Sequence, residues 1–249
     1  MRTNLFLLFT VFSFTFGIAQ KKERLLMVGN SFTFYYNLPM TIEQLAIDKG
    51  LCWEVHQSTA SGATLKHHWK GEKQLKTKRR IKRRKYDHII FQEHSTNPLK
   101  AIDTTQKYLN KLVERSSRNA TKYLYATWCY PSVFNEEYPP VSSLKIEKAL
   151  ASIQPSNTVI LPVGRAFDLF HSRYQDQTLF TSDDKHPNPV GSYLAACVIF
   201  SKISGLSSKG LIRRVAKKGK NGKDVFYFIV EKKTAEQCQR IADEIVFGN

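Results

Sequence analysis

Residue types that together support nucleophilic catalysis occur in two distant segments of this chain. Ser31 ends a Gly-Asn-Ser segment that directly follows an apolar run, and residues 183–186 are Asp-Asp-Lys-His. A serine hydroxyl is a weak nucleophile until a base takes its proton, and His186 is the candidate base. Asp183 could hold the imidazole in the required tautomer, although Asp184 could serve instead. The set predicts acyl-transfer chemistry at Ser31.

Acyl transfer also needs hydrogen-bond donors for the negative oxygen of the tetrahedral intermediate. The backbone N–H groups of Ser31 and Gly62 are two candidates, because both residues follow predicted strands. The side-chain amide of Gln92, which follows another predicted strand, is expected to be a third donor. Removing one such donor typically lowers the rate about 10²–10³-fold.

Other polar and aromatic side chains follow the same strands. Because the carboxyl ends of parallel strands meet at one edge of a sheet, we expect them near the nucleophile. Glu93 and His94 are expected to contact substrate or to have a structural role, rather than to be catalytic. The complete set of predicted oxyanion and substrate-binding residues is Gly62, Gln92, Asn30, Glu93, His94 and Trp128.

The elements that must position these residues follow from hydrophobic patterning. Continuous apolar runs without polar alternation are typical of strands covered on both faces. Such strands are predicted at residues 25–28, 88–91, 123–126 and 158–163, and a fifth, more exposed strand is predicted at residues 53–56. Helical periodicity between and after them predicts helices at residues 38–49, 104–115, 142–153, 188–203 and 234–246. This alternation predicts an α/β fold with a parallel sheet, followed by a turn at residues 219–224 and a short strand at 225–230.

The N-terminus has the layout of a secretory signal peptide. Arg2 precedes an uncharged, mostly apolar stretch that ends in small residues, so cleavage after Ala19 is expected. An uncleaved anchor is the alternative, but the apolar run is shorter than the about 20 residues of a membrane span. We therefore expect a signal peptide at residues 1–19, one domain at 20–249, and an exported protein, periplasmic or secreted.

The formal net charge of +17 is unevenly distributed. Residues 66–85 hold eleven Lys or Arg and one acidic residue, Glu72. The run is either a solvated helix face or a surface that attracts anions. An acidic polysaccharide or an anionic membrane surface is favoured over nucleic acid, because the chain carries an export signal and Trp69 is the only aromatic residue of the run. His67 and His68 are expected to be exposed.

The cysteines give no indication of a metal centre. No CxxC spacing and no histidine partner at zinc-site distance occurs, so neither metal nor cofactor is expected. Whether disulfides form is left open for Cys52, Cys129, Cys197 and Cys238.

The chemistry-bearing segments resemble the conserved blocks of SGNH (GDSL-type) hydrolases, in particular exported bacterial members. Residues 29–33 are similar to the first block, where GDS or GNS carries the nucleophile, and residues 183–188 to the last block, DxxHP. Gly62 matches the glycine of the second block. The third block normally contains GxND, and here Gln92 stands in place of its asparagine. The resemblance implies metal-free ester hydrolysis and a flavodoxin-like three-layer α/β/α sandwich, with a central five-stranded parallel sheet in the order 2-1-3-4-5.

These inferences lead to an expected function. We expect a serine-dependent carboxylic-ester hydrolase that removes small acyl groups, such as acetyl, from an exported or extracellular carbohydrate, possibly an acidic one. One alternative is an SGNH lipase, thioesterase or acyltransferase, which a long apolar lid would favour; the sequence has none. The other is a non-catalytic, basic polysaccharide-binding protein, against which the complete Ser31, Asp183 and His186 set argues.

Overall fold

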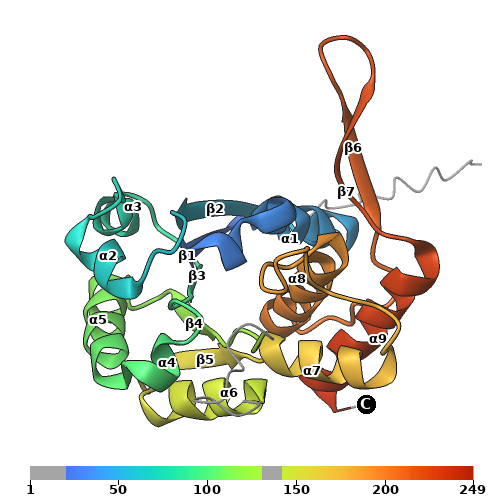
Figure 1. The fold of residues 1–249 in the computed structure, drawn as a ribbon. Coiled ribbons are helices and arrows are strands. Elements are labelled where there is room, and N and C mark those ends of the chain that lie inside the picture. The colour runs from blue at the N-terminus through green and yellow to red at the C-terminus, as the bar shows by residue number, and fades with distance from the viewer. Residues whose placement is uncertain (1–20, 131–141, 249) are drawn as a thin grey trace, which may run out of the picture.

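A central parallel sheet organises the molecule. The computed structural model describes residues 21–130 and 142–248, so the predicted signal peptide lies outside the described residues. Five strands pair in parallel in the order β2-β1-β3-β4-β5, which confirms the predicted order (Figure 1). Their bounds are β1 (Glu23–Gly29), β2 (Trp53–Thr59), β3 (His88–Phe91), β4 (Thr121–Tyr125) and β5 (Thr158–Leu161).

Helices cover both faces of this sheet, so the expected three-layer α/β/α sandwich is confirmed. Alternate residues of β1 enter different cores: Leu25 and Met27 join one, while Leu26 and Val28 join the other. The first core is closed by α1 (Leu38–Asp48), α7 (Val163–Arg173), α8 (Pro189–Ser204) and α9 (Lys232–Phe247). The second is closed by α2 (Leu65–Lys70), α3 (Thr77–Arg83), α5 (Ile102–Arg115) and α6 (Ser143–Ser152). Two-sided coverage explains why the inner strands β1 and β3 lack polar alternation, whereas the edge strand β2 alternates and is mostly half-buried.

The basic run, residues 66–85, contains two short helices, α2 and α3. The side chains on the inward face of each helix are buried. Leu65 and His68, three residues apart on α2, are both buried. His68 is fully buried, with Nδ1 2.7 Å from Thr77 Oγ1 and Nε2 3.0 Å from the carbonyl oxygen of Gly29. The expectation that His68 is exposed is therefore wrong, because helical spacing turns it toward the sheet and away from its exposed basic neighbours.

A two-stranded antiparallel ribbon projects from the body of the molecule (Figure 1). It consists of β6 (Arg214–Lys218) and β7 (Asp224–Ile229), so the predicted late strand is present and has a partner that the sequence did not indicate. The base of the ribbon is anchored: Asn37 Nδ2 donates to the carbonyl of Tyr227 at 2.9 Å, and Phe228 packs near Tyr193.

Shorter elements complete the described chain: the 3₁₀ turns η1 (Ser31–Thr33) and η2 (Tyr35–Asn37), and the one-turn helix α4 (Asn97–Lys100). Among the described residues, no helix is long and apolar enough to cross a membrane. The four cysteines are unpaired.

Candidate active site

The turn after β1 places Ser31 at the carboxyl edge of the sheet. Asn30 caps η1, because its Oδ1 accepts the N–H of Phe32 at 3.1 Å. Its Nδ2 donates to the carbonyl of Ala63 at 3.0 Å, which ties the nucleophile turn to the loop after β2. A Cβ at Gly29 would crowd the side chains of Gln92 and Thr33, so glycine allows their close approach to the turn. Asn30 thus acts in the structure by shaping the turn.

Ser31, His186 and Asp183 form one hydrogen-bonded chain. Ser31 Oγ lies 2.8 Å from His186 Nε2, and His186 Nδ1 lies 2.5 Å from Asp183 Oδ2. This is the geometry in which a histidine can take a serine proton while a carboxylate fixes the imidazole tautomer. The structure brings together the three residues that the sequence predicted, although they lie at opposite ends of the chain.

The loop 181–186 presents Asp183, and not Asp184, to the imidazole. Asp183 Oδ1 accepts the N–H groups of Lys185 and His186 at 3.0 and 2.9 Å. Burial opposes ionisation of Asp183, but the hydrogen bonds from His186 and from Thr181 outweigh it and hold the pKa of this carboxyl well below its usual range. Asp184 is exposed and has a left-handed backbone (φ 52°), a conformation that aspartate tolerates.

Aromatic rings hold the base and its loop in place. The His186 ring stacks on Tyr35 with 4.2 Å between centroids, and its edge meets Phe32 at 5.5 Å. Trp128 is fully buried, stacked between Phe32 and Phe167, and donates from Nε1 to the carbonyl of Lys185 at 3.1 Å. The expectation that Trp128 binds substrate is therefore not met, because its ring is enclosed by the core and its N–H supports the histidine loop.

Gln92 is not placed as an oxyanion donor. Its side chain is fully buried, its Oε1 accepts the N–H of Asn30 at 2.8 Å, and its Nε2 donates to the carbonyl of Glu93. Gln92 does not line the pocket at Ser31, and this prediction is corrected: its side chain holds the nucleophile turn in place. The backbone N–H groups of Ser31 and Gly62 remain candidates, since neither has an acceptor within the part of the chain that the structure describes.

Glu93 and His94 have different environments: Glu93 is buried, whereas His94 lines the pocket. The buried Glu93 accepts the N–H groups of Leu65 and His94 at 3.3 and 2.6 Å, so it joins the start of α2 to the loop after β3. Burial raises the pKa of Glu93 to about 7 despite these hydrogen bonds. His94 lines the pocket, and burial together with the Lys185 charge lowers its pKa.

The pocket at Ser31 is small and mostly polar. Its volume is about 110 Å³, and it is lined by Asn30, Ser31, Phe32, Ser61, Gly62, His94, Ser95, Lys185 and His186. Sequence analysis did not single out Ser61, Ser95 or Lys185 as pocket residues. Their loops carry no further motif, and only the packing of the loops decides which side chains face the cavity. Lys185 Nζ lies 5.5 Å from the centroid of the Tyr130 ring, and Lys185 adds a cationic side chain to the pocket lining.

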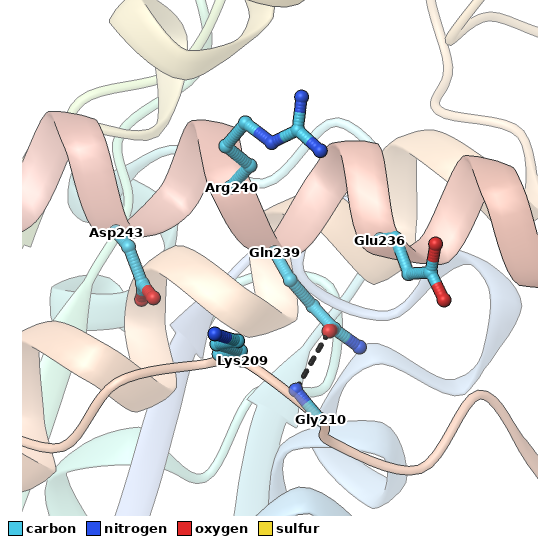
Figure 2. Close-up of a pocket in the computed structure, with 6 residues that line it drawn as sticks. All are labelled: Lys209, Gly210, Glu236, Gln239, Arg240 and Asp243. Carbon is cyan, nitrogen blue, oxygen red and sulfur yellow. Dashed lines mark hydrogen bonds between the residues drawn. The ribbon is translucent and has the colours of Figure 1, made fainter.

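A larger cavity of about 530 Å³ lies against α9, and its lining has no comparable pair of nucleophile and base (Figure 2). Its polar groups are used to hold the segment before β6. Gln239 Oε1 accepts the N–H of Gly210 at 2.9 Å, and Asp243 accepts from Ser207 and Ser208. Among the described residues, no cluster of histidine, cysteine or carboxylate side chains could hold a metal ion.

Comparison with known proteins supports the fold. No protein-family model and no curated protein matches the chain. A DUF4886 family protein from Bacteroides uniformis is 17% identical, with a TM-score of 0.69 over 92% of this chain and 96% of that one. A putative SGNH hydrolase from Slackia heliotrinireducens is 22% identical, with a TM-score of 0.59 over 74% of this chain and 100% of that one.

A third similar structure is the psychrotrophic esterase EstA from Pseudoalteromonas sp., inhibited by monoethylphosphonate. It is 14% identical, with a TM-score of 0.55 over 74% of this chain and 97% of that one. Similarity at this level of identity establishes the fold alone, so the chain shares the three-layer α/β/α fold of these structures.

Proposed function

We propose that this protein is a serine-dependent carboxylic-ester hydrolase. The observation that carries the proposal is the chain of contacts from Ser31 Oγ to His186 Nε2 at 2.8 Å and from His186 Nδ1 to Asp183 Oδ2 at 2.5 Å. These contacts combine three elements of acyl transfer: a nucleophile, a base within reach of its proton, and a carboxylate that orients the base.

The chemistry follows from these positions. Ser31 Oγ attacks the ester carbonyl while His186 Nε2 accepts its proton, and the same proton then passes to the departing alcohol. Water, deprotonated by His186, hydrolyses the acyl-serine and regenerates the hydroxyl. The backbone N–H groups of Ser31 and Gly62 would stabilise the tetrahedral oxyanion. Gly62 has a left-handed backbone (φ 59°), which suits a glycine at this position.

The pocket favours a small acyl group. A volume of about 110 Å³ can hold an acetyl group but leaves little room for a long chain. Phe32 is the only large apolar side chain in its described lining, so a long chain would gain little from leaving water there. This composition supports a short-chain esterase over the alternative of a lipase or a long-chain thioesterase.

The polar lining also supports a carbohydrate as the alcohol part of the ester. Ser61, Ser95 and His94 offer hydrogen-bonding groups of the kind that sugar hydroxyls need. Lys185 and the basic run around α2 and α3 would favour an acidic glycan. With export through residues 1–19, the proposal is a carbohydrate O-acetylesterase acting on an exported or extracellular polysaccharide. The alternative of a non-catalytic polysaccharide-binding protein would leave the triad geometry unused.

A substrate panel tests this proposal. Wild-type protein and Ser31→Ala would be compared on 4-nitrophenyl esters of increasing chain length and, by acetate release, on acetylated polysaccharides. We expect hydrolysis of the acetate ester to exceed that of the octanoate ester, and Ser31→Ala to be inactive on all substrates. Preference for octanoate would contradict the small-acyl assignment, and full activity of Ser31→Ala would contradict serine catalysis. Acetate release from no polysaccharide would contradict the carbohydrate assignment.

A further inference from the structure

A second cavity, separate from the one at Ser31, lies between α3 and the edge strand β2. Its volume is about 350 Å³, and five cationic side chains line it: Lys76, Arg79, Arg80, Arg83 and Arg84. His56 of β2 and Tyr86 complete the lining. We call this feature the basic cavity.

The local fold explains why so many cations meet at one concave surface. Thr77 and Ile81, one helical turn apart, form the buried face of α3. Arg79, Arg80 and Arg83 lie on the rest of the helix surface and remain exposed. The chain then leaves the helix at Arg84 in an extended conformation and buries Tyr86 under the cavity. Packing of the apolar face thus fixes the position of the charged one.

Most of this charge has no carboxylate partner within residues 21–130 and 142–248. Arg84 Nη1 lies 3.6 Å from Glu54, a carboxylate that also contacts Lys22 and Arg24. Among the described residues, no carboxylate comes within 4.0 Å of the four other cations, Lys76, Arg79, Arg80 and Arg83. Like charges three or four residues apart on a helix repel each other and destabilise it. A bound anion would relieve that repulsion.

We propose that the basic cavity binds the anionic groups of an acidic polysaccharide. Guanidinium groups bind carboxylate, sulfate and phosphate oxygens through paired hydrogen bonds, so the four clustered arginines of the cavity favour such oxoanions. A concave site accepts a group that protrudes from a chain, whereas a flat membrane surface could not enter it. Tyr86 is only 5% exposed, so the cavity offers no aromatic surface for nucleobase stacking.

The basic cavity lies close enough to Ser31 for one polymer to occupy both sites. Thr77, at the start of α3, contacts His68, which in turn contacts the carbonyl of Gly29 in the nucleophile turn. From Thr77, the seven residues of α3 rise about 10 Å toward Arg83. An acidic chain bound in the cavity would therefore present acylated sugars near Ser31. This link to the substrate rests on the proposed function; anion binding in the cavity does not.

The test compares two triple variants with the same change in charge. Arg79→Gln/Arg80→Gln/Arg83→Gln removes cations that line the cavity, and Lys66→Gln/Lys82→Gln/Lys85→Gln removes exposed cations of the same run that do not. Both carry Ser31→Ala, so the probe is not turned over. The probe is an oligogalacturonate of defined length, titrated calorimetrically at physiological ionic strength, and circular dichroism checks that each variant is folded.

We expect the cavity variant to bind oligogalacturonate at least about tenfold more weakly, and the control variant to stay within about twofold of the parent. A heparin-derived oligosaccharide of similar length tests whether sulfate is preferred to carboxylate. Equal losses in both variants would mean general attraction by net charge and would overturn the site. Cavity-dependent binding of single-stranded DNA or phosphatidylserine vesicles, without binding of either oligosaccharide, would overturn the polysaccharide assignment.

The binding test can fail independently of the test of the proposed function. If the wild-type protein hydrolyses no ester but oligogalacturonate still binds in the cavity, only the esterase assignment fails. If the protein deacetylates neutral glycans and no acidic oligosaccharide binds the cavity, only the present inference fails.

Discussion

The side-chain carbonyl of Gln92 accepts the backbone N–H of Asn30 at 2.8 Å. This bond joins the end of β3 to the residue just before the nucleophile, and Gln92 is fully buried while it makes it. The amide that sequence analysis assigned to the oxyanion is thus used inside the fold to hold the nucleophile turn.

Replacing Gln92 by Ala should therefore lower stability as well as activity. The Asn30 N–H would lose its buried acceptor, which costs about 1–3 kcal/mol of the free energy of unfolding. Urea denaturation measures this loss. Asn97→Ala serves as a control, because it removes a longer side-chain contact at a half-buried position. Unchanged stability with a large fall in kcat would restore the oxyanion role.

Ser31→Ala and His186→Ala should each reduce kcat for acetate ester hydrolysis by roughly 10⁴–10⁶. Because the two side chains act as one unit, the double variant should be scarcely worse than either single variant. Steady-state kinetics on 4-nitrophenyl acetate checks this. Losses that simply add would show that Ser31 and His186 act independently, despite the 2.8 Å contact between them.

Asp183→Asn should lower kcat by about 10³–10⁴, because an amide no longer fixes the imidazole tautomer. Asp184→Asn is the matched control: its side chain makes no contact with His186 within the described structure, and we expect a change of less than about twofold. If the damage followed Asp184 instead, the loop 181–186 would have a different conformation in solution.

Glu93 should make stability depend on pH. Burial raises its pKa in the folded state to about 7, above the ordinary value of 4.5, so the folded state binds the extra proton. Stability contributed by this group is therefore present below about pH 4.5 and is lost as pH rises through 7. Glu93→Gln keeps an acceptor for the N–H groups of Leu65 and His94 and removes the titration.

The measurement is the unfolding free energy of both proteins from pH 5 to pH 8. The wild type should lose about 2–3 kcal/mol relative to Glu93→Gln over that range. A difference that stays constant with pH would show that Glu93 titrates normally, and a difference that grows in the opposite direction would show that the fold favours its ionised form.

The buried His68 and its half-buried neighbour His67 offer another matched pair. His68→Ala removes a buried hydrogen-bond partner of the Gly29 carbonyl and of Thr77, which keeps only its contact with Ser58, and opens a cavity, so we expect a loss of about 2–4 kcal/mol in stability. His67 pairs with Glu72 at the surface, and His67→Ala should cost less than about 1 kcal/mol. Thermal denaturation distinguishes the two, and equal losses would contradict the burial of His68.

The catalytic candidates and the parallel sheet could be predicted because each depends on local pattern, whereas the order of the strands was implied only by the resemblance to SGNH hydrolases. Unbroken apolar runs specify strands covered on both faces, and helical periods between them specify parallel crossovers. Once the strands are parallel, residues that follow them must meet at one edge, which is why Ser31, Asp183 and His186 could be grouped from the sequence.

Side-chain direction was decided only by the tertiary structure. Gln92, Trp128 and His68 each carry groups that could face a substrate or solvent, but each makes a hydrogen bond to a distant segment of the chain, at Asn30, Lys185 and Gly29 respectively. The pocket residues Ser61, Ser95 and Lys185 belong to three separate loops, and no spacing within any one loop shows which side chains converge. A buried polar group must find a partner, and that partner exists only after the strands and helices have packed.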